Sequence, residues 1–129
     1  MSDGVARMRA SDRVADALGM HVAECGGGRA RVRMRIGPDM VNGHGIAHGG
    51  YVFLLADTAF AYACNSYGPV TVAAGAQIEF VAPAATGDML EATASEVARF
   101  GRSGIYDVSV RRGDDLIAEF RGRSRTIGA

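Results

Sequence analysis

The chain has 129 residues, 48% of them hydrophobic, and equal numbers of acidic and basic side chains give it a formal net charge of zero. This length suits one domain, residues 1–129, with a buried core, and the neutral charge gives no reason to expect nucleic acid or a membrane as a partner. The two cysteines lie far apart and the N-terminus lacks the apolar core of a signal peptide, so we expect a cytoplasmic protein.

The first part of the sequence predicts a helix followed by a hairpin. Residues 3–19 are expected to form a short amphipathic helix, with Ser11 as a cap and Gly19 as its end. In the segment RARVRMRI, residues 29–36, arginine alternates with apolar residues, which indicates an antiparallel strand with one buried face. Residues 22–24 are its expected partner, and a glycine-rich loop is expected after the strand.

A long apolar helix is predicted over residues 50–66, because this segment is rich in Ala and Leu and contains no proline. Strands separated by turns are expected after it, at residues 70–82, 89–99, 103–111 and 116–125. We expect an α+β fold in which this antiparallel meander and the two earlier strands wrap around the central helix. Because one small sheet covers only one side of a helix, a second subunit is expected to cover the rest.

One acid, Asp57, stands in the middle of this apolar helix. Asp is a poor residue for a helix interior, and burying an unpaired carboxylate costs on the order of several kcal/mol. The neighbours three and four positions away offer no partner, being Phe53, Leu54, Phe60 and Ala61. A solvent-facing Asp is the simplest alternative, but these surroundings favour a functional carboxylate.

Two glycines, Gly49 and Gly50, stand where the helix is expected to begin. The first N–H groups of a helix have no internal acceptor, and a glycine lets a ligand approach them without meeting a Cβ. The helix start is therefore a candidate oxyanion hole for a carbonyl oxygen that gains negative charge. A plain tight turn is the alternative, but the polar neighbours Asn42 and His48 can point at the same carbonyl and favour the oxyanion hole.

The distance between these two features predicts a second subunit. Gly49 and Asp57 are eight residues apart, which along a helix is about 12 Å. A carbonyl held at Gly49 is therefore out of reach of Asp57 in the same chain. If both act on one substrate, two antiparallel helices related by a two-fold axis must bring Gly49 of one subunit to Asp57 of the other, which gives a homodimer with shared sites.

Other common site motifs are missing from the sequence. His44 and His48 have the spacing of a zinc-binding helix, but the intervening residues include no Glu and their glycine argues against a helix, so no metal is expected. No phosphate-binding or dinucleotide fingerprint and no GxSxG motif occurs, and no cofactor is expected.

The segment NGHGIAHGGYVFLLADTAFAYACNSYG, residues 42–68, resembles the hotdog-fold acyl-CoA thioesterases, and among them the phenylacetate-pathway, or PaaI, type. The resemblance covers nearly the whole chain. It implies the hotdog fold and hydrolysis of an acyl-CoA substrate whose acyl group is aromatic, such as phenylacetyl or a ring-hydroxylated relative. It also implies that no metal is needed and that the subunits form a dimer of dimers, hence a homotetramer.

The resemblance also implies roles for the residues of the split site. The backbone N–H of Gly49 would hold the thioester carbonyl, and Asp57 of the partner subunit would act as nucleophile or general base. Asn42 and His48 would help to position the thioester or the attacking water.

This chain departs from the family at the hydroxyl that helps the acid. Several relatives carry a Ser or Thr one helical turn after the acid, where this chain has Ala61, and others use a Ser near Ala73 or Ala74. Thr58 is the nearest hydroxyl to the acid and is the remaining candidate for a contact with the substrate. The choice between nucleophile and general base stays open.

Further substrate-binding residues are expected from the chemistry of coenzyme A. Its phosphates favour clustered arginines, and the candidates are Arg99 and Arg102 at one turn and Arg123 and Arg125, with Arg121, on the last strand. A solvated basic strand face is the alternative. Phe80, with Phe53 and Phe60, is a candidate lining residue of an acyl pocket, although ordinary core packing is the alternative for each.

Two other functions remain open at this point. A hotdog dehydratase or hydratase would use a His and an acid on the β-carbon of a hydroxyacyl thioester and leave the thioester intact. A non-catalytic acyl-CoA binding module would bind without turnover, but a carboxylate beside an anionic ligand would bring it no benefit.

Overall fold

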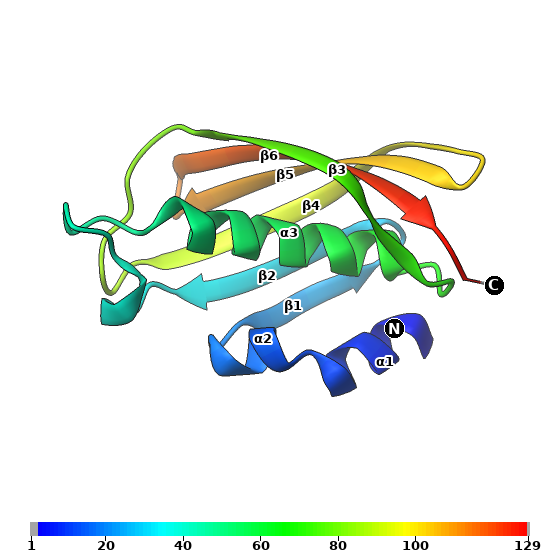
Figure 1. Ribbon diagram of the computed structural model, residues 1–129, viewed down its shortest axis with the longest axis horizontal. Helices are drawn as coiled ribbons and strands as arrows, with labels where there is room; N and C mark the ends of the chain where they lie inside the picture. The colour runs from blue at the N-terminus through cyan, green and yellow to red at the C-terminus, as the bar shows by residue number, and fades with distance from the viewer. Residues whose placement is uncertain (1–2, 129) are drawn as a thin grey trace.

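The computed structural model describes residues 3–128, in which one long helix lies across one face of a six-stranded antiparallel sheet (Figure 1). The elements in chain order are α1 (Asp3–Ser11), α2 (Arg13–Ala17), β1 (His21–Gly26), β2 (Arg29–Arg35), the 3₁₀ turn η1 (Pro38–Met40), α3 (Gly49–Asn65), β3 (Thr71–Phe80), β4 (Met89–Phe100), β5 (Ser103–Arg112) and β6 (Asp115–Thr126). This arrangement is the α+β fold that was expected, with the sheet curved around a central helix.

The N-terminal segment forms two helices, so the prediction of one helix over residues 3–19 is wrong. The chain leaves helical geometry at Asp12, whose backbone has φ −82° and ψ 83°, and the Asp12 carboxylate accepts the Ala15 N–H at 3.0 Å. Asp12 therefore caps α2, while Ser11 ends α1 instead of capping a helix. The helical run stops before Gly19, which has a positive φ of 67°.

The hairpin of β1 and β2 was correctly predicted from its alternating pattern. The apolar residues of residues 29–36 point toward α3 and are at most 2% exposed, namely Ala30, Val32, Met34 and Ile36. The two residues of the tight turn, Gly27 and Gly28, both have positive φ, which glycine adopts without strain.

The central helix α3 begins one residue before the predicted helix and contacts all six strands. Its buried aromatic side chain Phe60 lies with its ring centre 5.7 Å from those of Tyr106 and Phe120. Phe60 fits because β6 has Gly122 beneath it, where a Cβ would lie only 2.8 Å from the ring. This packing fixes the rotation of α3 against the sheet and therefore decides which of its residues face outward.

The strand order differs from the expected meander of four strands. The order is β1-β2-β4-β5-β6-β3, so only β4, β5 and β6 form a meander, and β3 pairs with β6 at the far edge. Residues 81–88 carry the chain from this edge back to β4, beside β2 (Figure 1). The alternation of a strand predicts its buried face but not its neighbour, and this long connection lets β3 and β4 separate.

One side of α3 and the outer edge of β3 are left uncovered by the rest of residues 3–128. Most side chains of β3 are exposed, and on α3 a stripe of half-buried residues faces the same side, comprising Leu54, Asp57, Thr58 and Ala61. The sheet covers one side of the helix, as expected. Within the same residues, no helix is both long enough and apolar enough to cross a lipid bilayer.

Candidate active site

The start of α3 presents one backbone N–H that is free to bind a ligand. His48 is the N-cap, and its Nδ1 accepts the N–H of Gly50 at 3.0 Å. The N–H of Tyr51 is bonded to the His48 carbonyl at 2.9 Å. Among the described residues, the N–H of Gly49 has no acceptor, so it is the free donor at the positive end of the helix dipole.

The same cap defines the chemistry of the His48 ring. Because Nδ1 accepts a hydrogen bond, the proton of the neutral imidazole lies on Nε2. His48 is exposed, so this second nitrogen can donate to a ligand or to water. His48 therefore caps the helix through Nδ1, while Nε2 has no partner among the described residues.

Asn42 lies on the loop that leads into the helix start. Its side-chain oxygen accepts the N–H of His44 at 2.9 Å and that of Ile46 at 3.4 Å, and its backbone N–H donates to the Ile46 carbonyl at 2.8 Å. The oxygen thus holds the loop in shape. The Asn42 amide nitrogen keeps its two hydrogens for a ligand, since no described residue accepts them.

A cavity of about 430 Å³ opens beside Gly49 and Asn42. The rest of its lining is apolar and comprises Ile46, Ala47, Val52, Phe80, Val81, Ala82, Pro83, Ala84 and Ile117. Phe80, named as a candidate from sequence, lies directly against the helix start, where a Cβ on Gly49 would be 3.0 Å from the Phe80 ring. The predicted residues Gly49, Asn42, His48 and Phe80 therefore lie together at one end of α3.

Asp57 lies elsewhere, on the uncovered side of α3. It forms no hydrogen bond or ion pair with a described residue, and burial raises the pKa of its carboxyl above the usual value. It lines a second cavity, of about 300 Å³, whose other walls are Met8, Phe60, Ala61, Cys64, Asn65, Val70, Thr71, Val72 and Ala73. An unpaired carboxyl with a raised pKa in a cavity is the profile of a group that exchanges protons or attacks a substrate.

The two cavities have no lining residue in common. Gly49 and Asp57 are separated along the helix by eight residues, or about 12 Å. Within one chain, the free N–H of Gly49 and the carboxyl of Asp57 therefore lie at separate cavities, which is the separation expected from the helix rise.

Three hydroxyl or thiol groups near Asp57 are less suited to attack a substrate. Burial raises the pKa of the Cys64 thiol to about 12, so the thiol stays protonated at neutral pH. The Thr58 hydroxyl donates to the Leu54 carbonyl at 2.7 Å, within its own helix, and does not line either cavity at Gly49 or Asp57. The Thr71 hydroxyl is bonded to Thr126 and to the Pro69 carbonyl.

Two positions at which the family resemblance led us to look for a hydroxyl lie in the same cavity as Asp57. Ala61 and Ala73 both line its cavity. In this chain both positions present a methyl group to the cavity.

The candidate arginines are not equivalent. Arg99 pairs with Glu96 at 2.8 Å and its guanidinium stacks 3.6 Å above the ring of Tyr67, so it is already occupied. Arg121 binds Asp107 through two hydrogen bonds of 2.6 and 2.9 Å. Three others, Arg102, Arg123 and Arg125, make no ion pair with a described residue.

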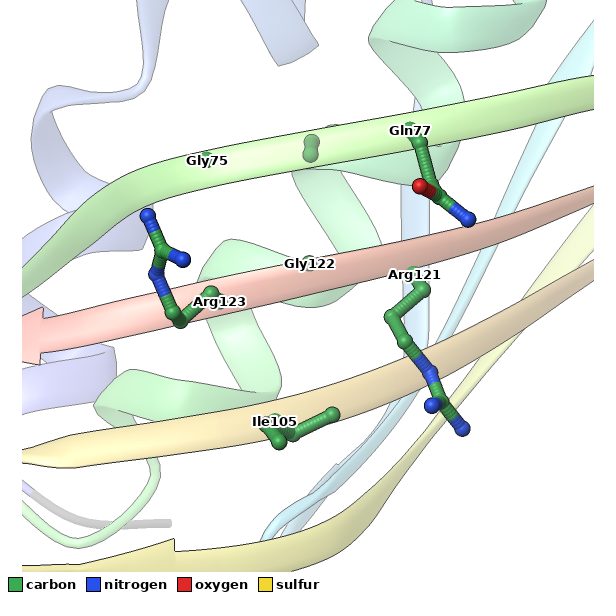
Figure 2. A pocket seen from close by; sticks show the side chains of 7 residues that line it. Gly75, Gln77, Ile105, Arg121, Gly122 and Arg123 are labelled. Atoms are coloured by element: carbon green, nitrogen blue, oxygen red, sulfur yellow. The ribbon is translucent and has the colours of Figure 1, made fainter.

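A groove of about 440 Å³ runs over the outer face of β3, β6 and β5 (Figure 2). Arg123 rises at one end of it, and its guanidinium lies over Gly75, where a Cβ would be 3.2 Å from Arg123 Nη2. Gln77 projects at the other end, whereas Arg121 points away across β5 (Figure 2). The groove therefore presents the guanidinium of Arg123, which has no ion-pair partner among the described residues, above two glycines, Gly75 and Gly122.

Two site features were not predicted from the sequence. The capping role of His48 could have been found, because a polar residue directly before the first glycine of a helix is in the N-cap position. The presence of Met8 in the Asp57 cavity could not, because no local pattern tells where an N-terminal helix docks. Among residues 3–128, no cluster of three His, Cys, Asp or Glu side chains forms a candidate metal site.

Comparison with known proteins agrees with this arrangement. Residues 44–119 match the family described as the thioesterase superfamily. The chain is 43% identical to the acyl-coenzyme A thioesterase PaaI of Escherichia coli (strain K12), over 94% of this chain and 87% of that protein.

Solved structures give the same result. The E. coli PaaI protein from the phenylacetic acid degradation operon superimposes with a TM-score of 0.95 at 41% identity, covering 98% of this chain and 92% of that one. A mutant of the phenylacetic acid degradation protein PaaI from Thermus thermophilus gives a TM-score of 0.85 at 36% identity, covering 88% of this chain and 98% of that one. The hotdog fold expected from the sequence is thus confirmed, and the chain belongs to the thioesterase superfamily.

Proposed function

We propose that this protein is an acyl-CoA thioesterase that converts an aryl-acyl-CoA, such as phenylacetyl-CoA or hydroxyphenylacetyl-CoA, to the free acid and CoA. The observation that carries the proposal is the free N–H of Gly49 beside the amide of Asn42, at the mouth of an apolar cavity. Two converging donors suit a thioester carbonyl, and an apolar cavity suits the uncharged parts of the substrate on either side of that carbonyl. The 43% identity to a PaaI thioesterase supports the same class of substrate.

The working site is assembled from two subunits. The free edge of β3 and the uncovered side of α3 lie next to each other and can both be buried by a second copy. With two α3 helices antiparallel across a two-fold axis, Gly49 of one subunit lies near Asp57 of the partner subunit. Two such dimers would form the tetramer, and its place would be the cytoplasm, where two free thiols such as Cys25 and Cys64 persist.

The reaction begins with polarisation of the thioester carbonyl. The Gly49 N–H and the Asn42 amide donate to the carbonyl oxygen, and the helix dipole stabilises the negative charge that gathers there. Removal of one such donor typically costs about 10²–10³ in kcat. The Nε2–H of His48 is placed to hold the attacking water or the departing sulfur.

The carboxylate of Asp57 of the partner subunit completes the reaction in one of two ways. It can attack the carbonyl carbon, so that the C–S bond breaks, CoA leaves as a thiolate, and water then hydrolyses the mixed anhydride. Alternatively, it removes a proton from a water that attacks the carbonyl, and the proton passes to the departing thiolate. In both cases the carboxylate is restored and one water is consumed.

The phosphates of CoA would bind the arginines that are not already paired. Arg102, Arg123 and Arg125 have free guanidinium groups, whereas a phosphate at Arg99 would have to displace Glu96. The variants Arg102→Gln, Arg123→Gln and Arg125→Gln are expected to raise KM for an acyl-CoA several-fold. They should leave KM unchanged for the matching acyl-pantetheine, which lacks the nucleotide, and equal effects on both would rule out a role in binding the phosphates.

The experiment that tests the function is thiol release from phenylacetyl-CoA, hydroxyphenylacetyl-CoA and aliphatic acyl-CoAs. Wild type should release CoA from the aryl substrates fastest, and Asp57→Asn should be slower by about a hundredfold, or about 2.7 kcal/mol of barrier. Binding of every thioester without release of thiol would contradict the proposal and favour a binding module. A change at the β-carbon with the thioester intact would favour a dehydratase.

A further inference from the structure

The cavity around Asp57 has one wall that comes from the N-terminal helix. Apart from Met8, every lining residue belongs to α3, to β3 or to the segment between them. Met8 lies on α1 and is half-buried. Since α1 packs along the C-terminal part of α3 (Figure 1), its Met8 side chain closes the cavity on a side that the sheet does not reach.

The N-terminal half of α1 is held closely against the turn after α3. Gly4 touches this turn so tightly that no room is left for a Cβ beside the Gly68 carbonyl oxygen. Val5 is completely buried, and Arg7 Nη2 donates to the same Gly68 carbonyl at 3.3 Å. These contacts hold the residues of α1 that precede Met8.

The chain that follows Met8 is held by Asp12. One oxygen of its carboxylate accepts the Tyr62 hydroxyl of α3 at 2.9 Å, and the other caps α2 through the Ala15 N–H at 3.0 Å. Tyr62 is only 1% exposed, so the anchor is rigid. Because α1 is held at its start by the turn after α3 and just past its end by Tyr62 of α3, these contacts set the position of Met8 relative to Asp57.

The chemistry of this cavity suits the acyl end of the substrate. The carboxylate of Asp57 repels the phosphates of CoA, and most other walls are apolar. The polar groups are already engaged: the Asn65 amide is bonded to the backbone of Thr71 in both directions, at 2.9 and 3.0 Å. An uncharged acyl group loses no hydrogen bond in such a cavity, whereas the amides of pantetheine would lose theirs.

We propose that Met8 is a specificity-determining residue, which limits the size of the acyl group that can lie beside Asp57. A flexible thioether adapts to an aromatic ring and contacts it favourably, so an aryl group fits against it. This inference rests on the proposed thioesterase function. It adds that the N-terminal helix, which carries no part of the proposed reaction machinery, selects the substrate.

The test compares Met8→Trp and Met8→Ala with wild type on acetyl-CoA, phenylacetyl-CoA and the longer 4-phenylbutanoyl-CoA. Met8→Trp should lower kcat/KM for the two aryl substrates at least about tenfold and change acetyl-CoA less than about twofold, because the indole fills the cavity. Met8→Ala should raise kcat/KM for the longer substrate relative to acetyl-CoA. Ala10→Trp is the matched control, since Ala10 is exposed on the same helix and outside the cavity.

Two results would overturn the inference. One is an equal effect of Met8→Trp on all three substrates, which would place Met8 against the CoA part or make its role only structural. The other is identical selectivity of Met8→Ala and wild type. Calorimetric binding of phenylacetyl-CoA and of free CoA to the same variants separates this inference from the proposed function: if no variant or wild type releases thiol, selective weakening of phenylacetyl-CoA by Met8→Trp still supports the role of Met8.

Discussion

The ring of Phe80 lies against the backbone of Gly49, where an added Cβ would be 3.0 Å from Phe80 Cζ. Phe80 belongs to β3 and Gly49 to the start of α3, and both line the apolar cavity at the helix start. The ring is itself 56% exposed, so it can move by a few tenths of an ångström. A donor shielded from water on one side binds a developing oxyanion more strongly than a fully hydrated donor.

The role of the Gly49 N–H can be tested by replacing it with proline. Gly49→Pro removes this donor and no other hydrogen bond, because proline suits the first position of a helix and the preceding His48, at φ −61° and ψ 133°, has the geometry that a following proline requires. Proline also adds a Cβ beside the Phe80 ring, so a matched control is needed. We expect kcat to fall by about 10²–10³ with little change in helix content. Thiol release and circular dichroism measure the two quantities.

Gly49→Ala is the matched control for that variant. It adds the same Cβ contact with Phe80 but keeps the N–H, so we expect no more than about a fivefold loss. If alanine and proline reduce kcat equally, the loss comes from crowding against Phe80, and Gly49 is not the oxyanion donor.

Asn42→Asp separates the two functions of the Asn42 side chain. The carboxylate still accepts the N–H groups of His44 and Ile46, so the loop keeps its shape, but the donor is lost and a negative charge faces the carbonyl. We expect a loss of about a hundredfold or more in kcat and an unchanged melting temperature. Full activity of this variant would show that the Asn42 amide does not contact the substrate.

His48→Asn tests whether His48 contributes more than a helix cap. Asn is among the best N-cap residues, so the cap on Gly50 is preserved and the free energy of unfolding should change by less than about 1 kcal/mol. The Nε2 donor is lost, and we expect kcat to fall by about tenfold or more. If activity stays at the wild-type level, the role of His48 is structural only.

The raised pKa of Asp57 predicts how stability depends on pH. Burial makes the folded protein bind the Asp57 proton more tightly than the unfolded chain does, so the ionised carboxylate destabilises the fold. This penalty is fully present above the raised pKa and disappears as the pH falls below the unfolded value of about 3.9. Asp57→Asn should therefore be more stable than wild type at pH 7 and lose this advantage in acid.

Urea unfolding of both proteins between pH 4 and 8 measures this difference. In the same range, kcat/KM of wild type should fall as the pH decreases, with a midpoint above that of an ordinary Asp, because the reaction needs the carboxylate. Equal stability of Asp57→Asn and wild type at every pH would mean that the Asp57 carboxyl is solvated. Burial would then no longer support a catalytic role for Asp57.

The sequence was sufficient for the features that depend on local pattern. The alternation of arginine with apolar residues in residues 29–36 predicted the buried face of β2, and the glycines before an apolar run predicted the start of α3. Helix rise alone separated Gly49 from Asp57, and the two cavities reproduce that separation.

Features that depend on distant contacts were missed. The pairing of β3 with β6 is decided by how the segment at residues 81–88 crosses the sheet, which no strand pattern encodes. The Asp12 carboxylate between α1 and α2 also accepts the Tyr62 hydroxyl fifty residues later in the chain, a contact that no local pattern indicates. Whether an arginine is free or paired also depends on strand register, as the pair of Arg121 with Asp107 across β6 and β5 illustrates.

Complementation between two inactive variants shows whether each site takes Gly49 from one subunit and Asp57 from the other. Chains carrying Gly49→Pro and chains carrying Asp57→Asn would be co-expressed with different tags, and the mixed dimers purified through both tags. Each mixed dimer would contain one intact site and one doubly altered site, so we predict about half of the wild-type activity from two nearly inactive parents. Activity no higher than that of the parents would contradict the shared site and place both groups of the reaction in one chain.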